Sequence, residues 1–288
     1  MAEPGATASV INEGRRSPLV DFFVRLVKTK PFGTAGGLVI LVLIFIAIFA
    51  DIIAPYPPNE LHVLDRLQGP SAKYLLGTDQ VGRDLLSRLI DGGRISLFVG
   101  FAATTLNIVF AILVGGISGF IGGKFDLVTQ RFVDAWMAFP SLLLLLTIMS
   151  LTGPGLLQII VVLGVSGGIG GSRVPRGAVV AIKENDYFQA ARAVGTPMGR
   201  TLFLHVLPNI MAPMLIVFSV NIGGNILSAA SLGFLGYGLP PSTPDWGSML
   251  SQEGMQYMES APWLALWPGV CLTVVVYSLN MFGEALRD

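Results

Sequence analysis

The sequence predicts an all-α membrane protein with six transmembrane helices, and two observations carry this prediction. The 288 residues are 52% hydrophobic and only 12% charged, whereas charged residues make up about a quarter of an ordinary soluble domain. Apolar runs close to the roughly 20 residues that a helix needs to cross a bilayer recur along the chain. The expected spans are residues 37–53, 95–121, 135–151, 156–171, 210–230 and 263–282.

Composition also excludes several classes of function. The 18 basic residues balance the 18 acidic ones, so net charge does not favour a nucleic-acid partner. Cys271 is the single cysteine, and His62 and His205 are the only histidines, which leaves no cluster with metal-ligand spacing. We therefore expect no metal site, no catalytic residues and no cofactor bound by this chain.

The lysines and arginines predict the orientation in the membrane. Most of them fall on the cytoplasmic side if both termini are cytoplasmic, as the positive-inside rule requires. We therefore expect a cytoplasmic N-terminal segment, residues 1–36, and a transmembrane domain, residues 37–288. The domain would carry an outer loop at residues 55–94 and a cytoplasmic loop at residues 173–207.

Before the first span, residues 17–28 have the pattern of an amphipathic helix. Ser17 and Pro18 suit a helix start, and apolar residues then face away from Arg25 and Lys28. This pattern is typical of a helix lying in the inner membrane interface. A cytosolic extension of the first span fits equally well.

Small residues follow one face of the second span. Ala111, Gly115, Gly119 and Gly123 recur every four positions, a spacing that lets another backbone approach closely. Packing within the subunit is favoured over a contact between subunits.

The remaining spans carry three features of interest. Glycines dilute the fourth span, and Asn221 and Asn225 lie one turn apart on the fifth. Unpaired amides are costly in lipid, so these two either line a wet pathway or bond a neighbouring helix. Tryptophans at the outer ends are expected to anchor the chain in the interface; they are Trp246, Trp263 and Trp267.

The chain has no visible energy source of its own. No ionisable residue lies in the middle of an expected span, whereas ion-driven transporters usually carry one there. The glycine-rich phosphate loop that ends in Gly-Lys-Ser/Thr is also missing. A transporter with neither device is a passive channel or draws its energy from a partner.

The cytoplasmic loop at residues 173–207 predicts a short, exposed helix. Asp186 can cap the helix and Gln189 completes a capping box. Gly195 suits the left-handed position after the helix, a second helix begins at Pro197, and Pro208 is expected to stop it before the fifth span. Such a helix could insert into a groove of another protein or merely connect two spans.

Residues of this loop resemble the EAA motif of permease subunits in binding-protein-dependent ABC importers, with Gln189 where the family usually has glutamate. Two other segments resemble those of the dipeptide, oligopeptide and nickel class, and in particular its C-type subunit. They are the outer-loop sequence GTDQVGRD at 77–84 and the sequence FLGYG at 234–238 followed by PPSTPDWG at 240–247.

The resemblance implies a MetI-like permease bundle in the bacterial inner membrane that forms half of a peptide pathway. Its implied partners are a second homologous permease, two ATPase subunits that bind ATP and magnesium, and an external substrate-binding protein. The implied ATPase-coupling residues are Asp186, Gln189, Ala190, Ala191, Gly195, Leu207 and Pro208.

In the outer loop, the motif either touches the binding protein or forms a buried turn that holds the loop against the bundle. Of these two interpretations, the buried turn is favoured. The motif residues are Gly77, Thr78, Asp79, Gly82, Arg83 and Asp84.

The cargo stays open at this stage. Nickel chelates and glutathione-like solutes are alternatives to peptides within the same architecture. An ion-coupled secondary transporter and a purely structural membrane scaffold are the alternatives of other classes. Missing intramembrane charges count against the former, and the cytoplasmic loop counts against the latter.

Overall fold

The computed structural model describes residues 27–287, and this part of the chain is a bundle of helices without a β-strand. A 3₁₀ turn lies at Val63–Asp65, and π-helical turns lie at Ile112–Gly116, Leu202–Val206, Gly233–Tyr237 and Met249–Met255. The helices are α2 (Pro31–Ile48), α3 (Ala50–Ile53), α4 (Leu85–Ala111), α5 (Ile117–Ile121), α6 (Gly123–Ala138), α7 (Ser141–Thr152), α8 (Leu156–Gly171), α9 (Arg173–Lys183), α10 (Asp186–Ala193), α11 (Met198–Thr201), α12 (Leu207–Leu232), α13 (Trp246–Ser248) and α14 (Trp263–Arg287).

The predicted fold class is confirmed. Among the described residues, four helical stretches are long and apolar enough to cross a bilayer, and two bent pairs raise the number to six if each pair makes one crossing. The bent pairs are α6 with α7 and α8 with α9. The four continuous stretches are Pro31–Ile48, Leu85–Ile121, Met198–Tyr237 and Trp263–Arg287.

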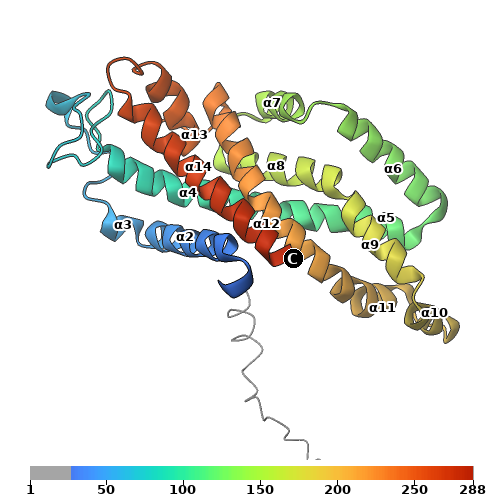
Figure 1. The fold of residues 1–288 in the computed structure, drawn as a ribbon. Coiled ribbons are helices and arrows are strands. Elements are labelled where there is room, and N and C mark those ends of the chain that lie inside the picture. The colour runs from blue at the N-terminus through green and yellow to red at the C-terminus, as the bar shows by residue number, and fades with distance from the viewer. Residues whose placement is uncertain (1–26, 288) are drawn as a thin grey trace, which may run out of the picture.

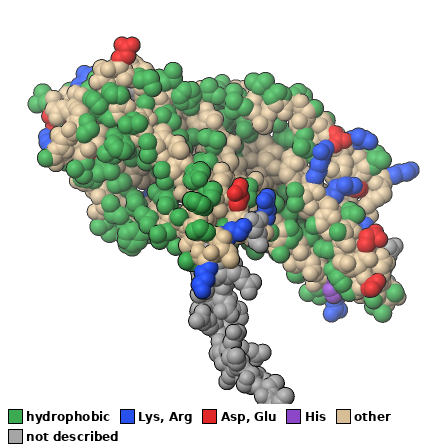
Figure 2. Space-filling view, viewed as in Figure 1, with side chains coloured by type: hydrophobic (Ala, Val, Ile, Leu, Met, Phe, Trp, Pro, Cys, Tyr) green, Lys and Arg blue, Asp and Glu red, His purple; other side chains and the backbone are tan. Residues whose placement is uncertain are grey.

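The bundle has two chemically different ends. In Figure 1 the loop between α3 and α4 lies at one end, and α10 and α11 lie at the other. The helices α6 and α7 form an arm beside α8. Figure 2 shows apolar side chains over the middle of the molecule and basic side chains gathered toward the end that carries α10.

The third predicted span, residues 135–151, is wrong as a single straight helix. The axes of α6 and α7 differ by 92°, and Phe139 between them has extended backbone angles, φ −81° and ψ 138°. The ring of Pro140 keeps the preceding residue out of the helical region, and the proline nitrogen has no proton to donate. The chain therefore turns at this point.

Glycines in α8 strengthen its packing instead of diluting the span. The predicted fourth span coincides with α8. A Cβ atom at Gly164 would lie 2.6 Å from the Cβ atom of Leu106 on α4, closer than two carbon atoms can come without a shift. Only glycine allows the two helices to approach to this distance.

The stripe of small residues on the second span also packs within the chain, as predicted. A Cβ atom at Gly115 would lie 1.7 Å from the carbonyl oxygen of Ser172, and one at Gly119 would lie 3.0 Å from the carbonyl oxygen of Arg176. The stripe therefore holds the end of this span against α9.

Pro208 does not stop the helix before the fifth span, contrary to the prediction. The helical stretch runs from Met198 to Tyr237, and Pro208 lies in the first turn of α12. The π-helical turn just before it bonds the Leu207 amide to the Leu202 carbonyl, and this wider turn accommodates the proline ring. The last turn of the stretch contains Gly236, whose φ of +87° is not helical.

Trp246 is a core residue, so the prediction of an interfacial anchor is wrong for it. Its side chain is 2% exposed, and its indole nitrogen donates to the carbonyl oxygen of Leu89 over 3.0 Å. Asp245 caps α13 through the amides of Gly247 and Ser248, which turns the tryptophan inward. Gly93 provides the space, since a Cβ atom there would lie 2.8 Å from the indole ring.

Two predictions concern features that the structure does not test. The amphipathic helix expected at residues 17–28 lies almost entirely outside the described residues. The orientation of the termini depends on a membrane, and it stays a prediction.

Candidate functional site

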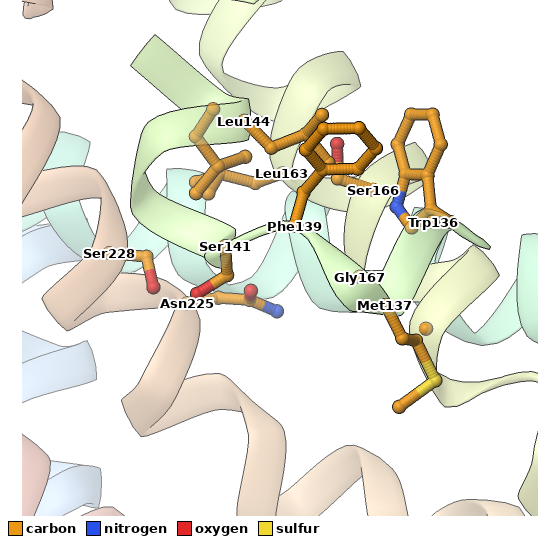
Figure 3. A pocket seen from close by; sticks show the side chains of 12 residues that line it. Trp136, Met137, Phe139, Ser141, Leu144, Leu163, Ser166, Gly167, Asn225 and Ser228 are labelled. Carbon is orange, nitrogen blue, oxygen red and sulfur yellow. The ribbon is translucent and has the colours of Figure 1, made fainter. Parts of the chain in front are cut away.

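A cavity of about 410 Å³ lies where the chain bends between α6 and α7. Its walls come from the bend itself, from α8 and from α12, as Figure 3 shows. The cavity is partly open, so a solute could reach it from outside the single chain. Its lining residues are Trp136, Met137, Phe139, Ser141, Leu144, Leu145, Leu163, Ser166, Gly167, Gly170, Asn225 and Ser228.

The described lining residues are all uncharged, and most of the surface is apolar. Polar groups come from one side chain on α7, one on α8 and two on α12, which are Ser141, Ser166, Asn225 and Ser228. Pockets for small molecules commonly combine apolar walls with a few such groups. Neutral walls would let a solute pass without holding its charged groups tightly.

Asn225 is fixed in orientation by a buried threonine. Its Nδ2 atom donates to Oγ1 of Thr104 on α4 over 2.8 Å, and Thr104 is fully buried. The Thr104 hydroxyl donates to the carbonyl oxygen of Gly100, so its oxygen is left to accept. The amide oxygen of Asn225 is therefore the end of the side chain available to the cavity.

Of the two roles that the sequence left open for Asn225, the structure shows the bond to a neighbouring helix, and the pathway role stays a prediction. Asn225 bonds a neighbouring helix and also lines the cavity. Asn221, one turn earlier, is half-buried and is not among the described lining residues. The serines and the bend were missed by sequence reasoning, although Pro140 was a visible signal for the bend.

The short helix predicted in the loop at residues 173–207 is present as α10, at the far end of the bundle; its coupling role stays a prediction. Gly195 has a φ of +74°, and the Thr196 amide donates to the carbonyl oxygen of Ala191 over 3.1 Å. This bond and the left-handed glycine form the Schellman ending of a helix, as predicted. The helix exit is therefore defined by this hydrogen bond and by the left-handed conformation of Gly195.

The start of α10 differs from the prediction. Asp186 is the first helical residue, and the backbone carbonyl of Asn185 accepts the first amide bonds. The side-chain Nε2 of Gln189 donates to the carbonyl oxygen of Lys183 over 2.8 Å. The capping box was therefore wrong, because the side chain of Gln189 reaches back to α9 instead of closing its own helix.

One face of α10 is anchored and the other is exposed. Phe188 is 5% exposed and packs in a cluster with Phe120, Val179 and Ile182. The opposite face exposes Ala190, and the helix exit exposes Val194 (81%). Leu207 packs against the same cluster, and Pro208 is exposed. A helix held in this way can present small side chains to a groove on another protein.

The outer-loop motif forms a buried turn around Asp79, which is the interpretation that the sequence favoured. The Asp79 carboxylate is fully buried and accepts from the backbone amides of Val81 and Arg83 at 2.9 Å each. The Arg83 guanidinium also donates to it, and Nε of Arg88 lies 3.7 Å away. Two arginines therefore neutralise one buried carboxylate.

Glycines and a cap complete this turn. A Cβ atom at Gly82 would lie 1.9 Å from the carbonyl oxygen of His62, and Gly82 also has a φ of +84°. Gly77 has a φ of +89°. Asp84 caps α4 by accepting from the Ser87 amide at 2.8 Å. The motif thus ties the loop to the start of α4.

A second polar group stiffens the loop nearby. Asp65 accepts hydrogen bonds from Nζ of Lys73 at 2.7 Å and from the Tyr74 hydroxyl at 2.8 Å. The carbonyl oxygen of Asp65 accepts from the Thr78 hydroxyl. The hydrogen bonds from Lys73 and Tyr74 hold the pKa of Asp65 below its ordinary value.

Comparison with known families gives two matches that together span most of the chain. Residues 95–288 match the family described as binding-protein-dependent transport system inner membrane component. Residues 17–70 match the N-terminal transmembrane domain of oligopeptide transport permease C.

Similar proteins carry related names. The dipeptide transport system permease protein DppC of Alkalihalophilus pseudofirmus is 39% identical over 272 residues, 94% of this chain and 89% of that protein. The di/tripeptide transport system permease protein DppC of Pseudomonas aeruginosa is 39% identical over 279 residues, 94% of this chain and 91% of that protein.

Among solved structures, a chain of the MetNI methionine ABC transporter in an inward-facing conformation has the same fold. The TM-score is 0.54 at 19% identity, and the match covers 69% of this chain and 95% of that chain. At this identity the likeness establishes the fold alone.

Proposed function

The chain belongs to the family of binding-protein-dependent transport system inner membrane components, and we propose that it forms half of the pathway of an ATP-driven importer of dipeptides and oligopeptides. A second, related permease would supply the other half. Two ATPase subunits would bind ATP and magnesium on the cytoplasmic side, and a substrate-binding protein would deliver the cargo from outside.

The observation that carries the proposal is the cavity at the bend between α6 and α7. Its uncharged walls suit a zwitterionic peptide, because a charged wall would bind one peptide terminus and slow its release. The fixed amide oxygen of Asn225 offers a hydrogen-bond acceptor to a passing N–H group. A partly open cavity is also what half of a two-subunit pathway would present.

Orientation follows in the same proposal. Both termini, residues 1–36 and the loop at residues 173–207 would be cytoplasmic, and the loop at residues 55–94 would face outward. The helix α10 would then meet the ATPases, and the turn around Asp79 would lie on the side of the binding protein.

Coupling would work through the exposed face of α10. A groove on an ATPase that receives Ala190 and the Gly195 exit moves the helix when the ATPases close, because a rigid element transmits displacement. Gln189 would tune the strength of docking rather than create it, since its amide is already bonded to α9.

The test is uptake by the complete complex in vesicles with a binding protein outside. Ala190→Trp should abolish peptide uptake while the subunit still inserts and assembles. Ala35→Trp, on an exposed position of α2, is the matched control and should leave uptake intact. Normal uptake and normal ATP hydrolysis by the Ala190 variant would defeat the coupling assignment. Peptide accumulation by this chain without its partners would contradict the proposal of an importer driven by partner ATPases.

A further inference from the structure

Two ion pairs join α9 to α6. Their residues belong neither to the cavity lining nor to α10 nor to the turn around Asp79. Arg176 on α9 makes a bidentate contact with Asp126 on α6, with Nε to Oδ1 at 2.7 Å and Nη2 to Oδ2 at 2.6 Å. The Asp126 side chain is 14% exposed and that of Arg176 is 35% exposed. Planar, paired hydrogen bonds of this kind fix direction as well as distance.

A second pair lies two turns further along α6. Arg173 on α9 bonds Asp134 on α6, and Arg131 on α6 contacts the same carboxylate at 3.0 Å. The side chains of Arg173 and Asp134 are 51% and 40% exposed, so this pair is weaker than the first, but a second attachment along the helix limits pivoting about the first. The helices α6 and α9 are therefore constrained to move together.

Apolar packing contributes little to holding α6 in the described chain. Of its 16 residues, only Val133 is buried. The ion pairs are consequently the main directional contacts between α6 and α9. Removing one ion pair should weaken the attachment of α6 to α9 without creating a cavity in the hydrophobic core.

On the other side, α9 and α10 are joined by shared packing on α5 and by one direct hydrogen bond. Phe188 of α10 meets Phe120 of α5 edge to face, with ring centroids 6.4 Å apart, and Val179 and Ile182 of α9 complete the cluster. Lys183 of α9 donates to the carbonyl oxygens of Gly119 and Phe120 on α5 at 3.1 and 3.0 Å. The side chain of Gln189 on α10 donates to the carbonyl oxygen of Lys183 over 2.8 Å, so α10 is attached to the C-terminal end of α9.

The far end of α6 reaches the cavity. Trp136 and Met137 follow Asp134 within one turn, and both line the cavity. Phe139 at the bend lines it as well. A shift of α6 must therefore change the shape of this wall.

We propose that the pairs Asp126–Arg176 and Asp134–Arg173 transmit displacement of α10 to the cavity wall, so that these four residues position the wall during transport. The inference rests on the proposed function for the role of α10. It adds a route: α10 moves α9, the ion pairs carry α6 along, and the wall formed by Trp136, Met137 and Phe139 follows. Asp126 and Arg176 are positioning residues and do not touch the cargo.

The first experiment uses charge exchange to distinguish transmission of movement from α9 to α6 from a purely structural role of the ion pair. Asp126→Asn should leave an assembled complex that hydrolyses ATP, while peptide uptake per ATP hydrolysed falls about tenfold or more, a loss of ordinary size for a coupling interaction. The double exchange Asp126→Arg with Arg176→Asp should restore most of it. Asp51→Asn breaks the exposed pair with Arg94 between α3 and α4 and should change nothing.

The second experiment reads the wall directly and does not depend on the cargo. In a Cys271→Ser background, Met137→Cys provides one thiol in the cavity. ATP should change the rate at which a soluble maleimide labels this thiol in the assembled complex. Asp126→Asn should remove that change, and the double exchange should return it.

The outcomes are distinct. An ATP response that persists in the Asp126→Asn variant would overturn the inference, as would failure of the double exchange in an assembled complex. If peptides are not taken up but the wild-type labelling responds to ATP and the Asp126 variant does not, the cargo is wrong and the ion-pair route stands.

Discussion

The turn around Asp79 and the helix α10 are both short, glycine-bearing motifs, yet they use their residues in opposite ways. The outer turn directs its polar groups inward, and Thr78, Asp79 and Asp84 are at most 2% exposed. The helix α10 buries Phe188 and exposes most of its other described residues. The first arrangement stabilises a loop, and the second leaves a surface for a partner. A short sequence motif therefore indicates contact with another protein only where its side chains are exposed.

The largest loss of stability is expected at Asp79. Asp79→Ala leaves two arginines near a buried site without their shared carboxylate, and breaking a buried ion pair typically costs about 3–5 kcal/mol. Denaturant unfolding of the purified subunit measures this loss. Gln189→Ala in α10 should cost less than about 1 kcal/mol, because its single hydrogen bond is exposed. Equal losses of unfolding free energy in the Asp79 and Gln189 variants would show that the buried turn is no more important for stability than the exposed helix.

The glycines give the next largest difference. Gly82→Ala must adopt a left-handed conformation and also place its Cβ atom against the His62 carbonyl, so we expect a loss above about 2 kcal/mol. Gly195→Ala meets open space and bears only the conformational cost of about 1 kcal/mol. Thermal unfolding of both variants provides the measurement. A greater loss at Gly195 would show that α10 is packed more tightly than its exposure indicates.

A smaller effect is expected from Gln189→Glu, which places the family's usual residue in α10. The free energy of unfolding should fall by less than about 1 kcal/mol, because the carboxylate cannot donate to the carbonyl oxygen of Lys183 but the hydrogen bond that is lost is exposed. The affinity of the permease for its ATPases should respond instead, because a charge is added on the docking side. Titration of detergent-solubilised permease with ATPase subunits tests this, with unchanged affinity counting against a docking role for the residue.

The smallest effect concerns pH at the outer loop. Because the folded pKa of Asp65 is lowered, its contribution to stability is present above the unfolded pKa of about 3.9. That contribution is lost as pH falls through the lower, folded pKa. The difference in melting temperature between wild type and Asp65→Asn should therefore be constant from pH 7 to 5 and vanish under strongly acid conditions. A difference that grows on acidification would contradict the assigned hydrogen bonds.

The sequence predicted local features best where one residue type decides them. Gly195 predicted the end of α10, because few other residues adopt its φ. The stripe of small residues on the second span predicted a close helix contact, because only small side chains let two backbones approach closely. The predictions for Pro208 and Gln189 were wrong because residues outside the motif decide both. The π-helical turn before Pro208 accommodates its ring, and the carbonyl oxygen of Lys183 accepts a hydrogen bond from the Gln189 side chain.

The sequence alone was enough to predict a helical chain, long apolar runs that suit a bilayer, and the positions of the short motifs. These properties follow from hydrophobicity, periodicity and backbone freedom, which act over a few residues. The burial of Trp246 and the position of Asn225 beside the bend at Pro140 depended on the tertiary structure. The hydrogen bond from Trp246 to Leu89 and the hydrogen bond from Asn225 to Thr104 each join residues more than about a hundred positions apart. Such partners are chosen by packing in space, which no local pattern records.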